Sequence, residues 1–229
     1  MERLDKILSV AASISRTDAK TAIRKGRVQV NGKTELSPDK KVEGENITLD
    51  GAPVTYKRFV YIMMNKPEGV VSASRDDRDI TATSLVKERG KRNLFPAGRL
   101  DKNTTGFLLL TDDGDFAHRI LSPSKHVEKE YEVTLDGPVS ERLIAEFKNG
   151  VDIGDVITRP ADLIITGENT ARVILREGKY HQIKRMFQKF SLKVTALHRI
   201  RMGSLYLCPE LSLGEYKELS EEEVSKIAQ

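Results

Sequence analysis

The order of short apolar segments constrains the fold of this chain more than any other feature of its sequence. Segments typical of buried strands lie at 59–64, 107–111, 131–135, 163–165, 171–175 and 193–197. Patterns typical of helices lie at 84–88, 116–121, 141–149, 181–189 and 221–227. Because the strands outnumber the helices and do not strictly alternate with them, the sequence predicts an α+β fold, with a mainly antiparallel mixed sheet flanked by helices.

Composition limits the class of protein. The 229 residues suffice for one large domain or two modest ones, and 38% hydrophobic with 31% charged residues is typical of an ordinary soluble protein. No apolar run approaches the roughly 20 residues that span a membrane. The single Cys208 excludes an internal disulfide and fits a reducing compartment. We therefore expect a cytoplasmic protein without a membrane partner. A net charge of +4 is too small to indicate nucleic-acid binding by itself.

The first fifty residues predict two helices followed by short strands. Ser15 is a candidate helix cap with Asp18 as its acidic partner, and Gly26 is a natural stop. Apolar side chains at helical spacing predict the core of this part: Leu4, Ile7, Leu8, Ala11, Ala19, Ala22 and Ile23. After Gly26 the period changes to two, and Asn31-Gly32 predicts a turn.

A second face of the later helix is basic. Arg16, Lys20 and Arg24 recur every four residues, and Lys25 extends this face. Charge alone is equally consistent with a solvated helix surface. The stretch RLDKILSVAASISRTDAKTAIRKGRVQVNGK (3–33), however, resembles an S4 domain, a small RNA-binding module. The resemblance implies an S4-like RNA-binding domain at 1–57, with Arg3, Arg16, Lys20, Arg24 and Lys25 near RNA phosphates. A larger domain would follow at 58–229.

Several acids follow the apolar run 107–110. Asp112, Asp113 and Asp115 do not have the spacing of a calcium loop, and no zinc pattern of Cys and His is present, so we expect no metal site. Asp101 differs because it lies in a loop that leads into a predicted buried strand, where catalytic groups are common. From these residues alone, Asp101 is either a turn-capping aspartate or a catalytic one.

The segment GRLDKNTTGFLLLTDDGDFAHRI (98–120) resembles the signature of pseudouridine synthases of the RsuA type. Four further segments resemble the same family in the same order: MNKPEGVV (64–71), EKEYEV (128–133), EGKYHQIKRMF (177–187) and LHRIRMGSLYL (197–207). Together with the S4-like start, the resemblance covers nearly the whole chain. It implies an isomerase that detaches uracil from ribose, turns it and rejoins it through carbon, with no cofactor.

The resemblance also implies roles for individual residues. Asp101 would be the essential carboxylate, acting on the sugar, on the base or on a sugar proton, with Lys184 as its basic partner and Arg185 as the neighbouring alternative. Tyr131 would stack on uracil, Leu197 would pack against the base, and Arg99 would fill the gap left by a flipped nucleotide. Weaker candidates for phosphate contacts are His181, Lys66 and Arg199.

The substrate implied by the resemblance is ribosomal RNA. Relatives that act on large-subunit RNA often carry Arg-Gln-Ile-Arg-Arg-Met where this chain has His181 to Met186. This difference favours small-subunit RNA, free or in an assembly intermediate, and we expect a monomer. The alternatives are the same chemistry on large-subunit RNA and a non-catalytic RNA-binding assembly factor.

Overall fold

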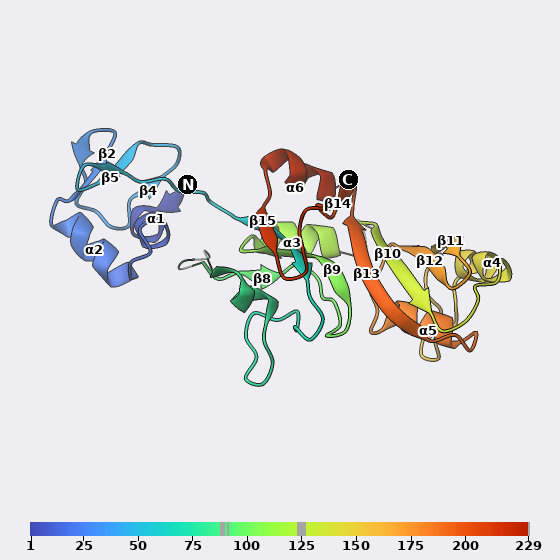
Figure 1. Cartoon of the computed structure of the whole chain (residues 1–229). Coiled ribbons are helices and arrows are strands. Elements are labelled where there is room, and N and C mark those ends of the chain that lie inside the picture. The colour runs from blue at the N-terminus through green and yellow to red at the C-terminus, as the bar shows by residue number, and fades with distance from the viewer. Residues whose placement is uncertain (88–89, 91, 123–126, 229) are drawn as a thin grey trace. The chain divides into compact units, whose positions relative to one another are not determined.

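A two-residue strand, two helices and further short strands form the first part of the chain (Figure 1). The computed structural model describes residues 1–87, 90, 92–122 and 127–228. The chain divides into two compact units: Met1–Phe59 with Lys87–Asn93, and Val60–Val86 with Leu94–Gln229. The first unit thus takes in a segment well beyond residue 57, and the domain boundary at 57/58 remains a prediction.

The helices of the first unit are α1 (Leu4–Ala11) and α2 (Arg16–Arg24). Ser15 caps α2 as predicted, because its side chain accepts a hydrogen bond from the backbone N–H of Asp18 at 3.1 Å. The predicted apolar residues form the core of this unit together with strand residues, with one exception. Ala11 was predicted to face inward but is exposed, because it lies in the last turn of α1.

Short antiparallel strands complete the first unit. β2 (Val28–Val30) pairs with β3 (Lys33–Thr34) and β5 (Ile47–Leu49), and β5 also pairs with β6 (Ala52–Pro53). A separate pair joins β1 (Glu2–Arg3) and β4 (Lys41–Val42). The predicted turn is present, since Asn31 and Gly32 both adopt positive φ between β2 and β3.

The second unit is built on one mixed sheet. The described strands run in the order β11-β12-β10-β13-β9-β7-β15, with β14 paired to β13 and β8 to β9. Their bounds are β7 (Tyr61–Lys66), β8 (Phe95–Pro96), β9 (Thr105–Thr111), β10 (Lys129–Leu135), β11 (Asp162–Gly167), β12 (Thr170–Leu175), β13 (Val194–Met202), β14 (Leu205–Tyr206) and β15 (Tyr216–Glu218). Between described strands, β13 and β9 are parallel and the other pairs are antiparallel. The predicted α+β class with a mainly antiparallel mixed sheet is confirmed.

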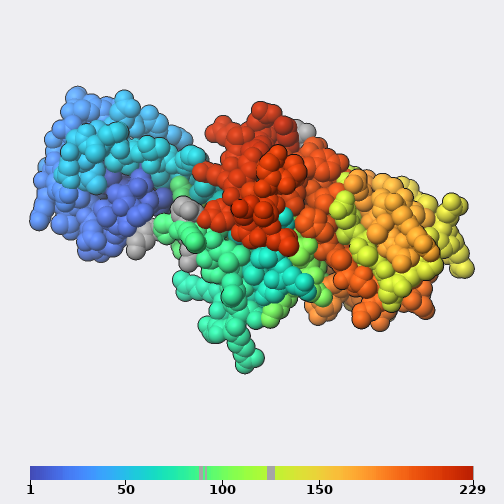
Figure 2. Space-filling view, viewed as in Figure 1, coloured from blue at the N-terminus to red at the C-terminus, as the bar shows by residue number. Residues whose placement is uncertain are grey.

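The central strands are buried on both faces, which explains their continuous apolar sequence. In β9, Phe107 and Leu109 enter one hydrophobic core, whereas Leu108 and Leu110 enter the other. Helices α3 (Gly114–Leu121) and α6 (Glu221–Ile227) contribute to the first core; α4 (Arg142–Asn149) and α5 (Gln182–Gln188) contribute to the second. Figure 2 shows β10, β11, β12 and α4, in yellow to orange, at one end of this unit.

Most predicted elements of the second unit are present with shifted ends. β7 begins two residues later than the predicted strand 59–64 and continues two residues further, through Asn65 and Lys66. The helix predicted at 84–88 is instead a 3₁₀ turn at Ala82–Leu85 capped by Thr81, and Glu88 lies outside the described residues. No helix in the described parts of the chain is both long and apolar enough to cross a bilayer.

Candidate active site

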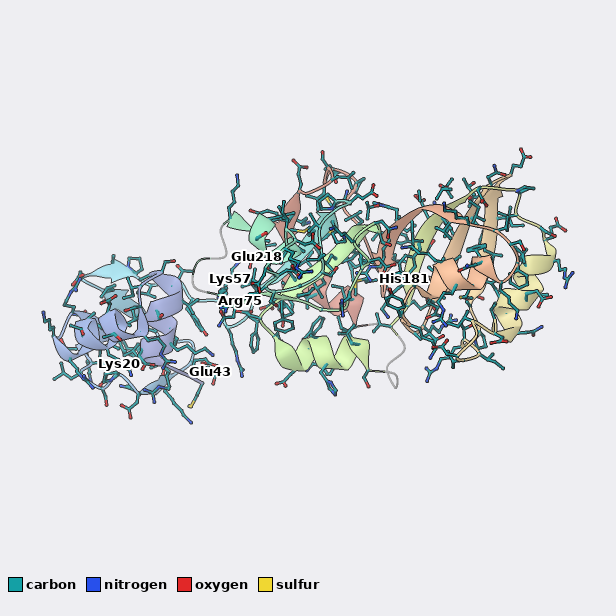
Figure 3. All side chains as sticks on the ribbon, turned by 90° about the horizontal axis from the view of Figure 1, so that it is seen from below. Lys20, Glu43, Lys57, Arg75, His181 and Glu218 are labelled. Atoms are coloured by element: carbon teal, nitrogen blue, oxygen red, sulfur yellow. The ribbon has the colours of Figure 1, made fainter. Side chains whose placement is uncertain are left out.

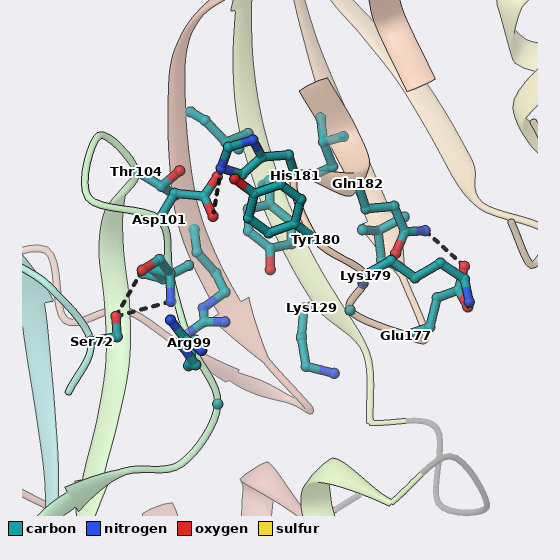
Figure 4. A pocket seen from close by; sticks show the side chains of 18 of the residues that line it. Ser72, Arg99, Asp101, Thr104, Lys129, Glu177, Lys179, Tyr180, His181 and Gln182 are labelled. Carbon is teal, nitrogen blue, oxygen red and sulfur yellow. Dashed lines mark hydrogen bonds and ion pairs between the residues drawn. The ribbon is translucent and has the colours of Figure 1, made fainter. Parts of the chain in front are cut away.

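Hydrogen bonds fix the loop that contains Asp101. The Ser72 hydroxyl donates to the carbonyl of Leu100 at 2.9 Å and accepts from the Leu100 N–H at 3.0 Å (Figure 4). Within the loop, the Thr104 N–H donates to the Asp101 carbonyl at 3.0 Å. Since Gly106 then begins the buried part of β9, the Asp101 side chain is held at the end of a rigid strand.

Lys66 supports the same loop from inside the protein. Its side chain is fully buried, and its ammonium donates to the carbonyls of Pro67 at 2.9 Å, Val70 at 2.6 Å and Lys102 at 3.4 Å. Burial lowers the pKa of Lys66 to about 8, against the opposing effect of the charge on Asp101. Lys66 therefore joins the end of β7 to the Asp101 loop, and its internal contacts do not fit the phosphate contact considered from the sequence.

A cluster of polar groups surrounds the Asp101 carboxylate. Lys184 Nζ lies 2.7 Å from Asp101 Oδ2 and also donates to Asn103 Oδ1 at 2.5 Å. His181 Nε2 lies 3.7 Å from Asp101 Oδ1, the pair drawn in Figure 4. His181 adopts positive φ just before α5, and its ring stacks on that of Tyr180 at 3.9 Å between centroids. The start of α5 thus presents a cation and an imidazole to one carboxylate.

Asp101 faces a pocket with a volume of about 1100 Å³, large enough for a nucleotide. Its lining includes seven of the predicted site residues: Arg99, Asp101, Tyr131, His181, Lys184, Leu197 and Arg199. Tyr131 lies on β10 directly opposite Arg199 on β13, and the Arg199 guanidinium carbon is 5.9 Å from the centroid of the Tyr131 ring. The pocket therefore brings together a carboxylate with its cation, an aromatic ring and an apolar side chain.

Other predicted site residues lie elsewhere. Arg185 is turned to the carbonyls of Ile153 and Tyr180 and forms an ion pair with Asp155, so Lys184, rather than Arg185, contacts Asp101. Arg3 and Arg16 both pair with the buried Asp5 in the first unit. Lys20, Arg24 and Lys25 belong to the same unit, and Figure 3 labels Lys20 there and His181 in the second unit.

Sequence reasoning missed Lys129 as a site residue and assigned Arg199 only a phosphate contact. Both line the pocket; Lys129 is 9% exposed and Arg199 1%. The predicted strand 131–135 left Lys129 out, whereas β10 begins at Lys129, so that residues 129 and 131 lie on one face of the strand. A search of the described residues finds no group of three or more His, Cys, Asp or Glu side chains arranged to hold a metal ion.

Comparisons with known proteins identify the family of this chain. Residues 60–189 match the family described as RNA pseudouridylate synthase, and residues 2–48 match the S4 domain. The uncharacterized RNA pseudouridine synthase YtzG of Bacillus subtilis (strain 168) is 44% identical, over 97% of this chain and 96% of its own. Ribosomal small subunit pseudouridine synthase A of Escherichia coli (strain K12) is 38% identical, over 98% and 99% of the two chains.

A solved structure gives the same result for the fold. The crystal structure of a pseudouridylate synthase superposes with a TM-score of 0.69 at 37% identity, covering 99% of this chain and 100% of the other. The predicted resemblance to this family and to the S4 domain is thereby confirmed. The chain belongs to the RNA pseudouridine synthase family and is an enzyme that isomerises uridine to pseudouridine in RNA.

Proposed function

We propose that this enzyme modifies a uridine of small-subunit ribosomal RNA and that Asp101 is its essential carboxylate. The observation that carries the proposal is the ion pair between Asp101 and Lys184 at the wall of a nucleotide-sized pocket. Relatives named ribosomal small subunit pseudouridine synthase A, at 38–40% identity over nearly the whole chain, support the choice of RNA. We also propose that the enzyme acts in the cytoplasm as a monomer.

The geometry supports a role for each neighbour of Asp101. Attack on sugar or base and removal of a sugar proton all need an ionised carboxylate, and Lys184 supplies the opposite charge at 2.7 Å. Tyr131 offers a ring face on which a flipped base stacks. Arg99, which is exposed and lines the pocket, is positioned to enter the gap that the flipped nucleotide leaves in the RNA.

The choice of RNA is tested by incubating the purified enzyme separately with small-subunit RNA, large-subunit RNA and a small-subunit assembly intermediate. Pseudouridine is then mapped by sequencing after chemical derivatisation. We expect one modified position in small-subunit RNA or its assembly intermediate and none in large-subunit RNA. Modification confined to large-subunit RNA would reject the substrate, and no modification of any RNA would reject the assignment of ribosomal RNA.

The first unit is proposed to bind RNA phosphates through its basic helix face. Lys20, Arg24 and Lys25 form no ion pair with any residue in the described portion of the chain, so their charges are available to RNA. Arg3 and Arg16 form ion pairs with Asp5, but their side chains are still 44% and 49% exposed. The unit would thus add affinity that depends on salt and little on base sequence.

Replacing Lys20, Arg24 and Lys25 together by alanine should weaken RNA binding and flatten its salt dependence. Each lost phosphate contact removes about 0.7–0.9 from the slope of log affinity against log salt, or about 2 to 3 in total. Fluorescence anisotropy at several salt concentrations measures the slope. Arg27→Ala is the control, because Arg27 is already paired with Asp50. An unchanged slope in the triple variant would exclude this helix face as an RNA contact.

A further inference from the structure

The pocket contains two buried cations that the proposed mechanism does not use. Lys129 and Arg199 line the same pocket as Asp101, and Figure 4 shows Lys129 among its side chains. Lys129 is 9% exposed and Arg199 1%. Within the described chain, neither forms an ion pair with a carboxylate, although Lys184 in the same pocket has Asp101. Buried charges normally have such partners, so this pair needs an explanation.

The existing hydrogen bonds of the two cations are incomplete. Lys129 Nζ donates to the carbonyl of Val127 at 2.9 Å, and Arg199 Nε donates to the carbonyl of Phe107 at 2.6 Å. Arg199 Nη2 is buried and has no hydrogen-bond partner among the residues that the structure describes. A buried donor without a partner destabilises the folded chain, so a site that retains one is suited to an acceptor that a ligand supplies.

The pKa of Lys129 also indicates that this part of the pocket is suited to a negatively charged ligand atom. Burial, together with a smaller effect of the positive charge of Arg199, lowers the pKa of Lys129 to about 8. Below about pH 8 Lys129 is protonated in both the folded and the unfolded chain, and folding bears the full cost of burying the charge. As the pH rises from about 8 towards 10.5, the folded chain loses this proton first and becomes relatively more stable. At neutral pH the buried positive charge of Lys129 therefore lowers the free energy of unfolding.

The chemistry of the reaction supplies a negative charge that these cations can hold. In each role open to Asp101, the carboxylate loses its charge, because it forms a bond to the sugar, forms a bond to the base or takes up a sugar proton. Attack on the sugar, or removal of its proton, breaks the bond from the sugar to N1, and attack on the base breaks the C5=C6 π bond. In each case the electron pair of the broken bond moves onto uracil, whose oxygens then carry the negative charge. When C5 of the turned base bonds to the sugar, the charge returns to Asp101, and the C5 proton passes to N1.

We propose that Lys129 and Arg199 form a subsite for an anionic oxygen of the flipped nucleotide. This inference rests on the proposed function. The oxygen has two possible sources with the same chemistry, a uracil oxygen that gains charge during the reaction and a backbone phosphate oxygen. Arg199 lies against the Tyr131 ring, at 5.9 Å from its centroid. A base stacked on Tyr131 would therefore bring its oxygens to the same side of the pocket as the unpaired Nη2.

The test compares Lys129→Met with the wild-type enzyme in single-turnover reactions on uridine RNA and on 5-fluorouridine RNA. Loss of the starting nucleotide is measured, because fluorine at C5 leaves no proton to pass to N1 in the last step. Loss of one preorganised donor is expected to slow the reaction about 100-fold. Fluorine withdraws electrons, so the base needs less help to carry the charge. If the oxygen belongs to uracil, the deficit shrinks on 5-fluorouridine RNA and RNA affinity is unchanged. If it belongs to a phosphate, the deficit is equal on both RNAs and the salt slope of binding falls by about 1.

Two further measurements distinguish a ligand-binding role of Lys129 from a structural one. At pH 7 Lys129→Met should raise the melting temperature by about 2 to 4 °C, and the gain should fade as the pH rises above 8. A lower melting temperature would show a structural lysine and contradict the proposal. Lys148→Met is the matched control, because Lys148 is exposed on α4 and pairs with Asp162. Lys129→Met reacting as fast as this control would overturn the subsite, whereas an inactive wild-type enzyme would overturn the proposed function instead.

Discussion

Asp101→Asn is expected to abolish pseudouridine formation while RNA binding is retained. Asparagine keeps the size of the side chain and can still contact Lys184, but it cannot be ionised, attack the nucleotide or take up a proton. Loss of an essential nucleophile or base typically lowers the rate by about 10⁴-fold or more. Single-turnover assays with excess enzyme measure this loss, and anisotropy measures RNA affinity.

The control for this substitution is Asp115→Asn. Asp115 is an exposed acid in the first turn of α3, within the same family segment as Asp101 but outside the pocket. It should retain nearly full activity. Activity of Asp101→Asn within tenfold of Asp115→Asn, taken as a margin of about 1.4 kcal/mol, would remove Asp101 from the mechanism.

Gly106→Ala is expected to have the largest effect on stability. Gly106 has φ of +101°, and a Cβ built there would lie 2.3 Å from the carbonyl oxygen and 2.6 Å from the nitrogen of Arg199. Both obstacles belong to the backbone of β13, which pairs in parallel with β9 at this residue, so neither can move as a side chain would. We expect a loss of more than about 4 kcal/mol, the range reserved for severe backbone and packing conflicts.

Gly154→Ala is the control that introduces backbone strain without a steric clash. Gly154 has nearly the same φ, +102°, but a Cβ there would meet nothing within 4 Å. Its substitution should cost only the strain of the backbone conformation, about 1–3 kcal/mol. Urea unfolding of the two variants, followed by circular dichroism, gives both values. If Gly106→Ala is no less stable than Gly154→Ala, then β9 and β13 do not approach each other as closely as described.

The sequence predicted the existence of most elements because their apolar periods are strong. The run 107–110 was recognised as a buried strand, and its alternate residues do enter cores on opposite faces of the sheet. The ends of elements were less predictable, because tertiary contacts decide them. Asn65 and Lys66 look like turn residues, yet β7 continues through them, since Asn65 binds the carbonyl of Leu211 and Lys66 binds carbonyls beneath the Asp101 loop.

The site was predictable only where residues carry a recognisable pattern. Asp101, Tyr131 and Lys184 were named from family motifs and do line one pocket, whereas the choice between Lys184 and Arg185 needed coordinates. Adjacent residues on a helix point in different directions, and only the packing of α5 decides which one faces the loop. Lys129 was overlooked because a lysine beside two glutamates resembles a solvated strand edge, and its burial depends on neighbours distant in sequence.

A map of pseudouridines in ribosomal RNA from cells that lack this chain tests whether the enzyme modifies small-subunit RNA through Asp101. We expect one position in small-subunit RNA to remain uridine, to be modified again when the wild-type chain is restored, and to stay unmodified when Asp101→Asn is restored instead. A complete set of pseudouridines in the cells that lack the chain, or modification restored by Asp101→Asn, would contradict the account.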